Sequence, residues 1–334
     1  MRILIISDAW HPQVNGVVVT LEMLARELQA LGHVVEVIGP DRFRTVSMPS
    51  YRSIHLAVLP SRRLVPMIQA FEPHALHIAT EGPLGWAARR WAIRTGTDFT
   101  TSFHTRFPEY LHARARVPMP LSYAFLRGFH SRARGTMVAT FSMRRELAGR
   151  GFSNLLPWSR GVDLQRFWPG DRQQWPWPGP IFLYVGRLAV EKNVARFLSL
   201  HLPGTKVVVG DGPQRAWLEA TYPHAKFVGE QRGATLARAY AGADVFVFPS
   251  ETDTFGLVLL ESLACGTPIA ALPVTGPADI LANASPGVGV LDNDLRAAAL
   301  RALGGDRLAC RAHAERFSWR ACAELFCNNL APTG

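Results

Sequence analysis

The sequence predicts an α/β protein of two doubly wound domains that face a common cleft. Short apolar runs alternate with segments of helical periodicity, and the same alternation starts afresh near residue 180. A segment rich in proline and tryptophan, residues 168–180, separates the two halves and forbids regular structure there. With 334 residues, 48% of them hydrophobic, the chain has enough apolar material for two cores.

The first domain is expected over residues 1–168. It opens on an apolar strand, Arg2–Ile6, and a helix is expected over Thr20–Leu31. Strands that alternate with helices imply a parallel sheet covered on both faces. Its further β-like runs are Val34–Ile38, Ile54–Leu59, Ala75–Ala79, Phe99–Phe103 and Thr136–Thr140.

The second domain is expected over residues 169–307 and is built on the same scheme. Its β-like runs are Ile181–Val185, Lys206–Val209, Val245–Phe248 and Ile269–Leu272. A last helical stretch, Leu308–Leu330, is long enough to leave this domain and return to the first. Ligands of doubly wound domains usually bind at the carboxyl ends of the strands.

The strongest chemical signal is the segment Pro249–Pro268, where a strand ends in a polar loop and an apolar helix follows. We expect the helix to begin near Phe255, with the free N–H groups of Phe255, Gly256 and Leu257 forming a phosphate site. Gly256 lets a ligand approach closely.

Two carboxylates flank this helix start, Asp253 and Glu261. A fully helical interval would separate them by about 12 Å, which is too far for the acid/base pair of a glycosidase. The spacing suits a ligand with hydroxyls at both ends and phosphates between them. The alternative is a capping aspartate and a solvated helical glutamate.

A second signal is Tyr184–Asn193, where a strand runs into a glycine and two cations, Arg187 and Lys192. A departing diphosphate needs preorganised positive charge where its negative charge develops. Either cation alone could be an ordinary loop residue, but their occurrence together favours a role at a phosphate.

The segment around Asp253 and Glu261 closely resembles the acid-x7-acid motif of family-4 glycosyltransferases, which adopt the GT-B fold. That motif usually begins with glutamate, where this chain has Asp253. The resemblance implies that Asp253 and the amides of Phe255–Leu257 hold the donor sugar and its phosphate, and that Glu261 accepts hydrogen bonds from the ribose. It also implies that Arg187 and Lys192 contact the diphosphate.

The same resemblance extends over residues 2 to about 282 and implies further site residues. The turn at Gly16 reaches towards the donor, and His104 lies beside the reacting sugar with a positioning and electrostatic role. Gly210 and Gly212 shape the nucleotide pocket. Arg160 stands in a turn near the cleft where the family commonly has asparagine.

The chemistry implied is front-face substitution with retention of configuration, in which the leaving diphosphate takes the acceptor's proton. Neither a metal ion nor a cofactor beyond the nucleotide sugar is expected, and the absence of Gly-x-Gly-x-x-Gly argues against NAD. Asp292-Asn-Asp294 has the form of a manganese motif, but Asp294 is expected to cap the next helix. We interpret the four cysteines as small buried hydrophobes rather than metal ligands: Cys265, Cys310, Cys322 and Cys327.

The excess positive charge lies in the first half: residues 1–169 hold 21 arginines, no lysine and 11 acidic residues. Within it, Tyr110–Arg134 is expected to form a basic amphipathic helix that lies on an anionic membrane. A core helix with a solvated face, or arginine use in a GC-rich genome, would also explain the pattern. Nucleic acid is not expected as a partner, since no recognition motif occurs. The arginines of the helix are Arg114, Arg116, Arg127, Arg132 and Arg134.

The predicted function is transfer of a hexose from a nucleoside diphosphate sugar to a lipid acceptor such as diacylglycerol. UDP-hexose is preferred slightly over GDP-mannose. The branch that the chain resembles most is bacterial and includes enzymes that glycosylate lipids, which favours a lipid acceptor but also permits soluble ones. A GDP-mannose-dependent enzyme with a soluble glycan acceptor stays open, as does an epimerase or hydrolase of the same fold. Without a signal peptide or an apolar stretch of spanning length, the protein is expected to be cytoplasmic and peripheral on the inner face of the membrane.

Overall fold

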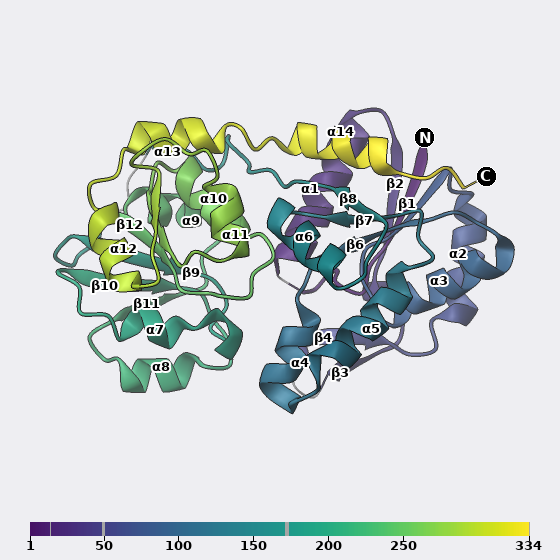
Figure 1. Cartoon of the computed structure of the whole chain (residues 1–334), viewed down its shortest axis with the longest axis horizontal. Helices are drawn as coiled ribbons and strands as arrows, with labels where there is room; N and C mark the ends of the chain where they lie inside the picture. Colours follow the sequence, from purple (N-terminus) through teal and green to yellow (C-terminus); the bar gives the residue numbers. More distant parts are fainter. Residues whose placement is uncertain (14, 49–50, 171–173, 334) are drawn as a thin grey trace. The chain divides into compact units, whose positions relative to one another are not determined.

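The chain forms two compact units in the computed structural model, which describes residues 1–13, 15–48, 51–170 and 174–333 (Figure 1). The first unit comprises Met1–Arg160 together with Trp319–Gly334, and the second comprises Gly161–Ser318. The division therefore falls eight residues before the expected boundary at residue 168, and the end of the chain belongs to the first unit. The side chains of residues 48, 51–54 and 113–115 are not among those described.

The first unit is built on a six-stranded parallel sheet with strand order β2-β1-β5-β6-β7-β8. All residues of β5, β6 and β7 are buried, as expected for a parallel sheet covered on both faces. The strands are β1 Arg2–Ile6, β2 Val34–Ile38, β5 Ala75–Ile78, β6 Thr100–Phe103, β7 Gly135–Val138 and β8 Leu155–Pro157. The helices before residue 160 are α1 Gly16–Ala30, η1 Pro40–Arg42, α2 Ser61–Phe71, α3 Pro83–Thr95, α4 Phe107–Ala115, α5 Met119–His130 and α6 Phe141–Gly149.

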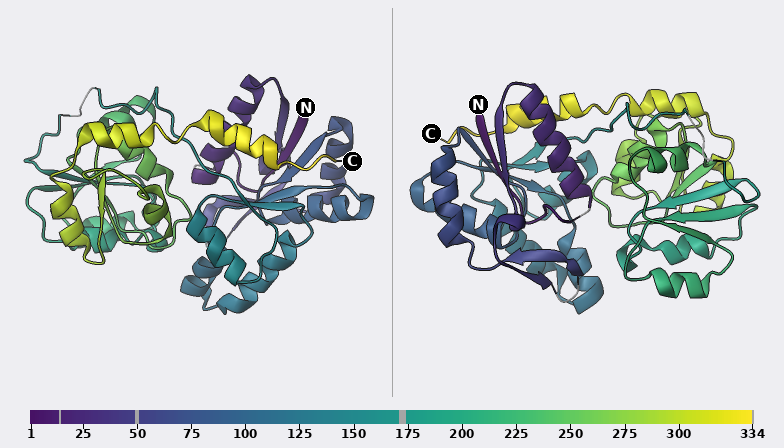
Figure 2. Two further views of the ribbon diagram at one scale, coloured as in Figure 1. Left: turned by 45° about the horizontal axis from the view of Figure 1, so that its top comes forward. Right: turned by 180° about the vertical axis from the view of Figure 1, so that it is seen from behind.

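Alternate side chains of β5 show which helices cover each face of this sheet. Leu76 and Ile78 belong to a core that α2 and α3 complete. His77, between them, faces the other way and contacts Phe326 of helix α14 (Trp319–Asn329), with ring centroids 4.8 Å apart. Helix α14 lies alongside α1 (Figure 2).

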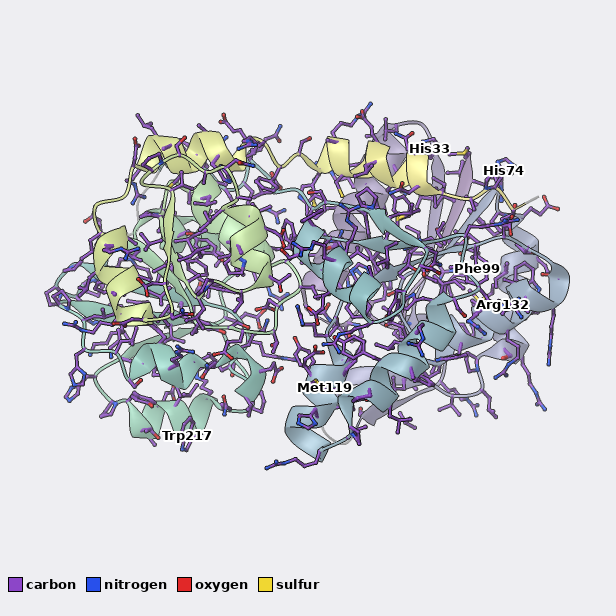
Figure 3. The ribbon with its side chains drawn as sticks, in the orientation of Figure 1. His33, His74, Phe99, Met119, Arg132 and Trp217 are labelled. Atoms are coloured by element: carbon purple, nitrogen blue, oxygen red, sulfur yellow. The ribbon has the colours of Figure 1, made fainter. Side chains whose placement is uncertain are left out.

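The last residues of the chain also bond to the first unit. The Thr333 amide donates to the carbonyl of His74 at 3.0 Å, and the Cys327 thiol lies 3.5 Å from Nε2 of His33. Both histidines are labelled in Figure 3. The end of the chain is expected from sequence to return to the first domain, and helix α14 belongs to the first unit.

Two expected elements of the first unit differ in the structure. The run Ile54–Leu59 belongs not to the parallel sheet but to a separate antiparallel pair, β3 (Thr45–Met48) and β4 (Tyr51–Ala57). Only two residues separate these strands, and a connection that short can join antiparallel neighbours but not parallel ones.

The single basic helix expected over Tyr110–Arg134 is two helices, α4 and α5. Arg116 adopts a left-handed conformation after α4, and Pro118 precedes α5. A proline disfavours the helical conformation of the residue before it, so the two helices cannot run on.

The long helix expected over Leu308–Leu330 is also two helices, α13 (Arg307–Ala314) and α14. They belong to different units. His313 of α13 is 2.7 Å from the carbonyl of Ile280, whereas the Cys322 thiol of α14 donates to the carbonyl of Ser159 at 3.1 Å. Each helix is therefore held by contacts within its own unit.

The second unit repeats the architecture, with strand order β11-β10-β9-β12-β13-β14, all parallel. Helices α7, α8 and α12 complete a core on one face, and Tyr240 of α9 packs on Phe246 from the other; Figure 1 shows α7 and α8 opposite α9 and α10. The strands are β9 Ile181–Val185, β10 Thr205–Val209, β11 Lys226–Gly229, β12 Val245–Phe248, β13 Ile269–Ala271 and β14 Gly289–Leu291. The helices are η2 Val190–Lys192, α7 Val194–Leu198, α8 Arg215–Thr221, α9 Gly233–Ala241, α10 Leu257–Ala264, α11 Thr275–Ile280 and α12 Leu295–Ala302, followed by α13.

Candidate active site

The loops that follow β9 and β12 lie side by side at the carboxyl edge of the second sheet. The chain winds from β9 outward through β10 to β11, and then returns to β12 on the other side of β9. This reversal is the topological switch point, where doubly wound sheets bind their ligands. The loop after β9 carries Arg187 and Lys192, and the loop after β12 carries Asp253.

An ion pair joins these two loops, between Lys192 Nζ and Asp253 Oδ1. The hydroxyls of Ser250 and Thr252 also lie 3.4 Å from the carbonyl oxygen of Glu191. The second oxygen of Asp253, Oδ2, is buried and has no hydrogen-bond partner among the residues that the structure describes. A buried acceptor without a donor is costly, so this atom is suited to a hydroxyl that arrives from outside.

Helix α10 begins at Leu257, two residues later than predicted, because Gly256 adopts a left-handed conformation with φ of 90°. No side chain caps this helix among the described residues. The first N–H groups of an α-helix have no partner within it and carry the positive end of its dipole. The start of α10 is therefore the kind of place that binds a phosphate.

Glu261 lies one turn inside α10, and its carboxylate accepts a hydrogen bond from the hydroxyl of Tyr240 at 2.9 Å. Desolvation raises the pKa of Glu261 to about 7, although Tyr240 and the charge of Arg166 act in the opposite direction. The carboxyl group can therefore exchange a proton near neutral pH when a ligand binds.

Gly210 and Gly212 have a packing role that the sequence did not reveal. A Cβ atom at Gly210 would lie 1.9 Å from the carbonyl oxygen of Gly186, and one at Gly212 would lie 2.5 Å from that of Leu188. The Leu188 amide donates to Asp211 at 2.9 Å. The two glycines thus hold the loop of Arg187 against the end of β10.

Two further residues shape these loops. The buried hydroxyl of Tyr184 donates to the carbonyl of Arg187 at 3.0 Å. Gly276 of α11 lies under the loop of Asp253, because a Cβ atom there would be 2.5 Å from the carbonyl oxygen of Phe255. Sequence reasoning missed Tyr240 and Gly276, since their partners are distant in sequence and no motif marks them. Tyr184 stands at the start of the Tyr184–Asn193 segment, but no sequence signal assigned a role to its hydroxyl.

In the first unit, His104 follows β6 and is buried within a chain of hydrogen bonds. Its Nε2 lies 2.8 Å from Ser102 Oγ, which lies 3.1 Å from Nε2 of the buried His77. Its Nδ1 lies 3.3 Å from Nη2 of Arg160. The sequence predicted His104 and Arg160 separately, and the structure brings them into contact.

Gly16 is the first residue of α1, and Asn15 caps that helix by accepting from the amides of Val17 and Val18. Asp8, at the end of the neighbouring β1, accepts from the amides of Leu84 and Gly85 at the start of α3. Burial raises the pKa of Asp8 to about 6. The starts of α1 and α3 are therefore occupied by side chains of the protein.

The acidic residues Asp292 and Asp294 precede α12, and Asp294 caps this helix. Asp294 accepts from the amides of Arg296 and Ala297, at 2.9 and 3.2 Å, which confirms its prediction as the N-cap of α12. Asp292 is 3.0 Å from Nη1 of Arg301. Cys265, Cys310 and Cys322 are buried and Cys327 is half-buried, and burial is the main factor that raises the pKa of each thiol.

Exposed apolar and basic residues share the surface of α4 and α5. Leu121 and Phe125, one turn apart on α5, are 65% and 57% exposed. Met119 begins the helix and the exposed Arg132 follows its end (Figure 3). Of the other arginines, Arg116, Arg127 and Arg134 are exposed, and the side chain of Arg114 lies outside those described. Arg127 donates to the carbonyl of Arg150, and Arg134 pairs with Asp98. Across the described residues, the structure contains no helix with the length and hydropathy needed to cross a bilayer.

Comparison with known proteins gives matches to both units. A family model described as Glycosyltransferase Family 4 matches residues 14–166, and one described as Glycosyl transferases group 1 matches residues 179–304. A GDP-mannose-dependent alpha-mannosyltransferase of Mycolicibacterium smegmatis is 33% identical, covering 88% of this chain and 85% of the relative. A GDP-mannose-dependent alpha-(1-6)-phosphatidylinositol dimannoside mannosyltransferase of Mycobacterium tuberculosis is 30% identical, covering 97% and 94%. The structure of sucrose-phosphate synthase from Thermosynechococcus elongatus superposes with a TM-score of 0.71 at 20% identity, over 98% of this chain and 97% of that one.

Proposed function

Since the chain belongs to glycosyltransferase family 4 and is a GT-B enzyme that uses a nucleotide sugar, we propose that it transfers mannose from GDP-mannose to a lipid-linked acceptor. The transfer would retain the anomeric configuration and need no metal ion. The names of the two mannosyltransferase relatives support guanosine over the uridine that the sequence slightly favoured. One of those names includes a phosphatidylinositol acceptor, which supports a lipid.

The observation that carries the proposal is the pairing of Lys192 with Asp253 beside the uncapped start of α10. In the reaction, the bond between the sugar C1 and the diphosphate oxygen breaks, and a bond forms between C1 and the acceptor oxygen. Lys192, Arg187 and the first amides of α10 would stabilise the negative charge that develops on the diphosphate. That diphosphate oxygen takes the proton of the acceptor hydroxyl, so charge and atoms balance without a protein base.

Each carboxylate has a separate role in this proposal. Asp253 Oδ2 would accept a hydrogen bond from a hydroxyl of the sugar, which satisfies its buried and unpartnered oxygen. Glu261 would accept hydrogen bonds from the ribose, and these favour its ionised form. The glycines of the β10 loop, Gly210 and Gly212, would act by holding the loop of Arg187.

A panel of donors tests the proposed donor. Purified protein is incubated with GDP-mannose, UDP-glucose or UDP-galactose, together with a phosphatidylinositol acceptor in vesicles, with and without EDTA. We expect product from GDP-mannose alone, with the α configuration of the donor retained in its NMR spectrum and with no loss in EDTA. Product from UDP-glucose alone would overturn the donor assignment, and inversion would overturn the mechanism. Rapid loss of donor without acceptor would indicate a hydrolase or epimerase.

The exposed surface of α5 supports a lipid acceptor, because apolar side chains beside arginines bind anionic bilayers. Sedimentation with vesicles of phosphatidylglycerol and phosphatidylcholine would compare wild type with Leu121→Ser and Phe125→Ser. The control is Leu308→Ser, which changes an 80% exposed leucine of the second unit. We expect weaker binding in the two α5 variants only, and equal binding in all four proteins would contradict a membrane role for this surface.

A further inference from the structure

We propose that Arg160 is a positioning residue that holds the ring of His104 in one neutral tautomer, and not a residue that binds the donor. This inference rests on the proposed function and on the family resemblance, which implies that His104 lies beside the reacting sugar. Arg160 is 4% exposed, and its guanidinium makes four contacts within its own unit. Nη1 donates to the carbonyls of Trp158 and Ser159 at 2.8 and 3.0 Å, Nη2 faces His104 Nδ1, and the group lies 4.0 Å from the centroid of the Trp158 ring.

The direction of each hydrogen bond fixes the tautomer. A guanidinium can only donate, so Nδ1 of His104 must be an unprotonated acceptor. The proton of the neutral ring is then on Nε2, which donates to Ser102 Oγ at 2.8 Å. The Ser102 hydroxyl donates a hydrogen bond to the carbonyl of Ala79, 3.2 Å away. The Nε2 proton of His104 and the hydroxyl proton of Ser102 therefore each have an acceptor.

The surroundings also keep the ring uncharged. Burial lowers the pKa of His104 well below its ordinary value, and the charge of Arg160 lowers it further, as His77 and His130 do more weakly. Because both ring nitrogens are used within the protein, the ring could accept a proton from an acceptor hydroxyl only by losing a hydrogen bond. This agrees with a reaction in which the leaving diphosphate takes that proton.

Helix α14 explains how the Arg160 side chain is itself held. The Cys322 thiol donates to the carbonyl of Ser159, and the Asn329 amide donates to the carbonyl of Pro157 at 2.6 Å. Phe326 packs on the Trp158 ring, with centroids 5.2 Å apart. The returning end of the chain thus fixes the segment 157–160 on which Arg160 stands.

The test measures the tautomer of His104 and the steady-state kinetics of the enzyme in two variants, Arg160→Met and Arg160→Lys. The His104 ring signals in ¹⁵N NMR are assigned by their absence from His104→Gln. In wild type we expect the Nε2-protonated tautomer, unchanged between about pH 5 and about pH 8. In Arg160→Met we expect mixed tautomers, a pKa nearer the ordinary value of about 6.5, and kcat lower by about 10- to 100-fold with the donor KM within about twofold. Lysine can still donate to Nδ1, so Arg160→Lys should keep the tautomer and part of the turnover.

The control is Arg89→Met, which removes another carbonyl-bonded guanidinium of the same unit, donating to Phe129 and Gly128 at 2.8 Å each. It should change neither the tautomer nor kcat. A higher donor KM in Arg160→Met with an unchanged tautomer would overturn the proposal in favour of anion binding, and an unchanged kcat would reduce Arg160 to a structural role.

If Arg160→Met does not fold, Ser102→Ala decides the question. That variant removes the acceptor of Nε2, together with the contacts of Ser102 to His77 and to the carbonyl of Ala79, and leaves Arg160 in place. A ring set by Arg160 therefore keeps its tautomer, and a mixed tautomer overturns the proposal. Inactivity of the wild type with every donor would contradict the proposed function instead, and the NMR measurement would still report on Arg160.

Discussion

The second unit contains two acidic pairs at comparable places, Asp253 with Glu261 and Asp292 with Asp294. Each follows a strand of the sheet and accompanies the helix that comes next, α10 or α12. Asp294 caps α12 with its own carboxylate, whereas α10 starts at a glycine, and none of the residues that the structure describes caps it with a side chain. A helix start that its own side chain already satisfies has little to offer an anion, and an open one can bind it.

The partners of the remaining carboxylates differ in the same way. Asp292 uses one oxygen for the amide of Asp294 and the other for Arg301, all within the same segment. Asp253 pairs with Lys192 across 61 residues and leaves Oδ2 without a partner among the described residues. The comparison teaches that the spacing of acids does not identify a binding site. What distinguishes the site is hydrogen-bonding capacity that the fold leaves open.

Removal of the Lys192 ammonium group should have the largest effect on turnover. In Lys192→Ala, the leaving diphosphate loses a preorganised charge, and kcat with the preferred donor should fall by about 100-fold or more. Lys226→Ala is the control, because that lysine lies over the Trp177 ring at the start of β11. Steady-state kinetics measures the kcat of both variants. Normal turnover of Lys192→Ala would show that the loops after β9 and β12 do not bind the diphosphate.

Glu261→Gln should weaken nucleotide binding by about 10- to 100-fold, the usual scale for a hydrogen bond to a charged group. The pKa of Glu261 is raised to about 7 by desolvation, and ribose hydroxyls favour the ionised form. Binding therefore releases a proton, and the Kd of wild type should fall as the pH rises through about 7.

Calorimetric titration with nucleotide at several pH values around 7 distinguishes wild type from Glu261→Gln, because the Kd of Glu261→Gln should not fall as the pH rises. Tyr240→Phe removes a hydrogen bond that lowers the pKa of Glu261, so its midpoint should move to higher pH. The folding stability of the ligand-free protein depends on pH in the opposite direction. Because the folded state raises the pKa of Glu261, the contribution of this group to the free energy of unfolding is lost as the pH rises from 4.5 to about 7. A Kd of wild type that does not change with pH would rule out Glu261 as the ribose acceptor.

Gly276→Ala should have an intermediate effect, because its Cβ would push against the carbonyl of Phe255 and shift the loop of Asp253. We expect a loss of about 1–3 kcal/mol in the free energy of unfolding and a higher donor KM. Gly149→Ala is the matched control, since nothing lies within 4 Å of its Cβ position at the end of α6. Equal donor KM values in the two variants would mean that the position of this loop does not matter for binding.

Much of the fold could be predicted from sequence because buried parallel strands are continuous apolar runs. Ile181–Val185 and Val245–Phe248 agree with β9 and β12 to the residue. Elements whose limits depend on packing could not be predicted in this way. The breaks between α4 and α5 and between α13 and α14 arise from a local proline and from a change of unit, and helical periodicity carries neither signal clearly.

The candidate site was predictable only where a motif placed residues on adjacent strands. Lys192 and Asp253 come together because β9 and β12 pair, an arrangement that follows from the doubly wound topology. Tyr240, by contrast, is an ordinary buried aromatic in sequence, and only the packing of α9 beside α10 gives its hydroxyl a carboxylate partner. The same holds for Arg160, whose contact with His104 depends on how α14 fixes its segment.

The smallest effect is expected from Asp294→Ala, and it completes the comparison of the two acidic pairs. Loss of the N-cap should lower the free energy of unfolding by about 1 kcal/mol, since two amides at the start of α12 lose their acceptor. Turnover should be unchanged with or without EDTA, because this carboxylate is used within its own helix. Chemical denaturation and an activity assay with added manganese measure the two quantities. A variant that folds normally but loses manganese-dependent turnover would reverse the assignment, since Asp292 and Asp294 would then hold the reacting diphosphate through a metal ion.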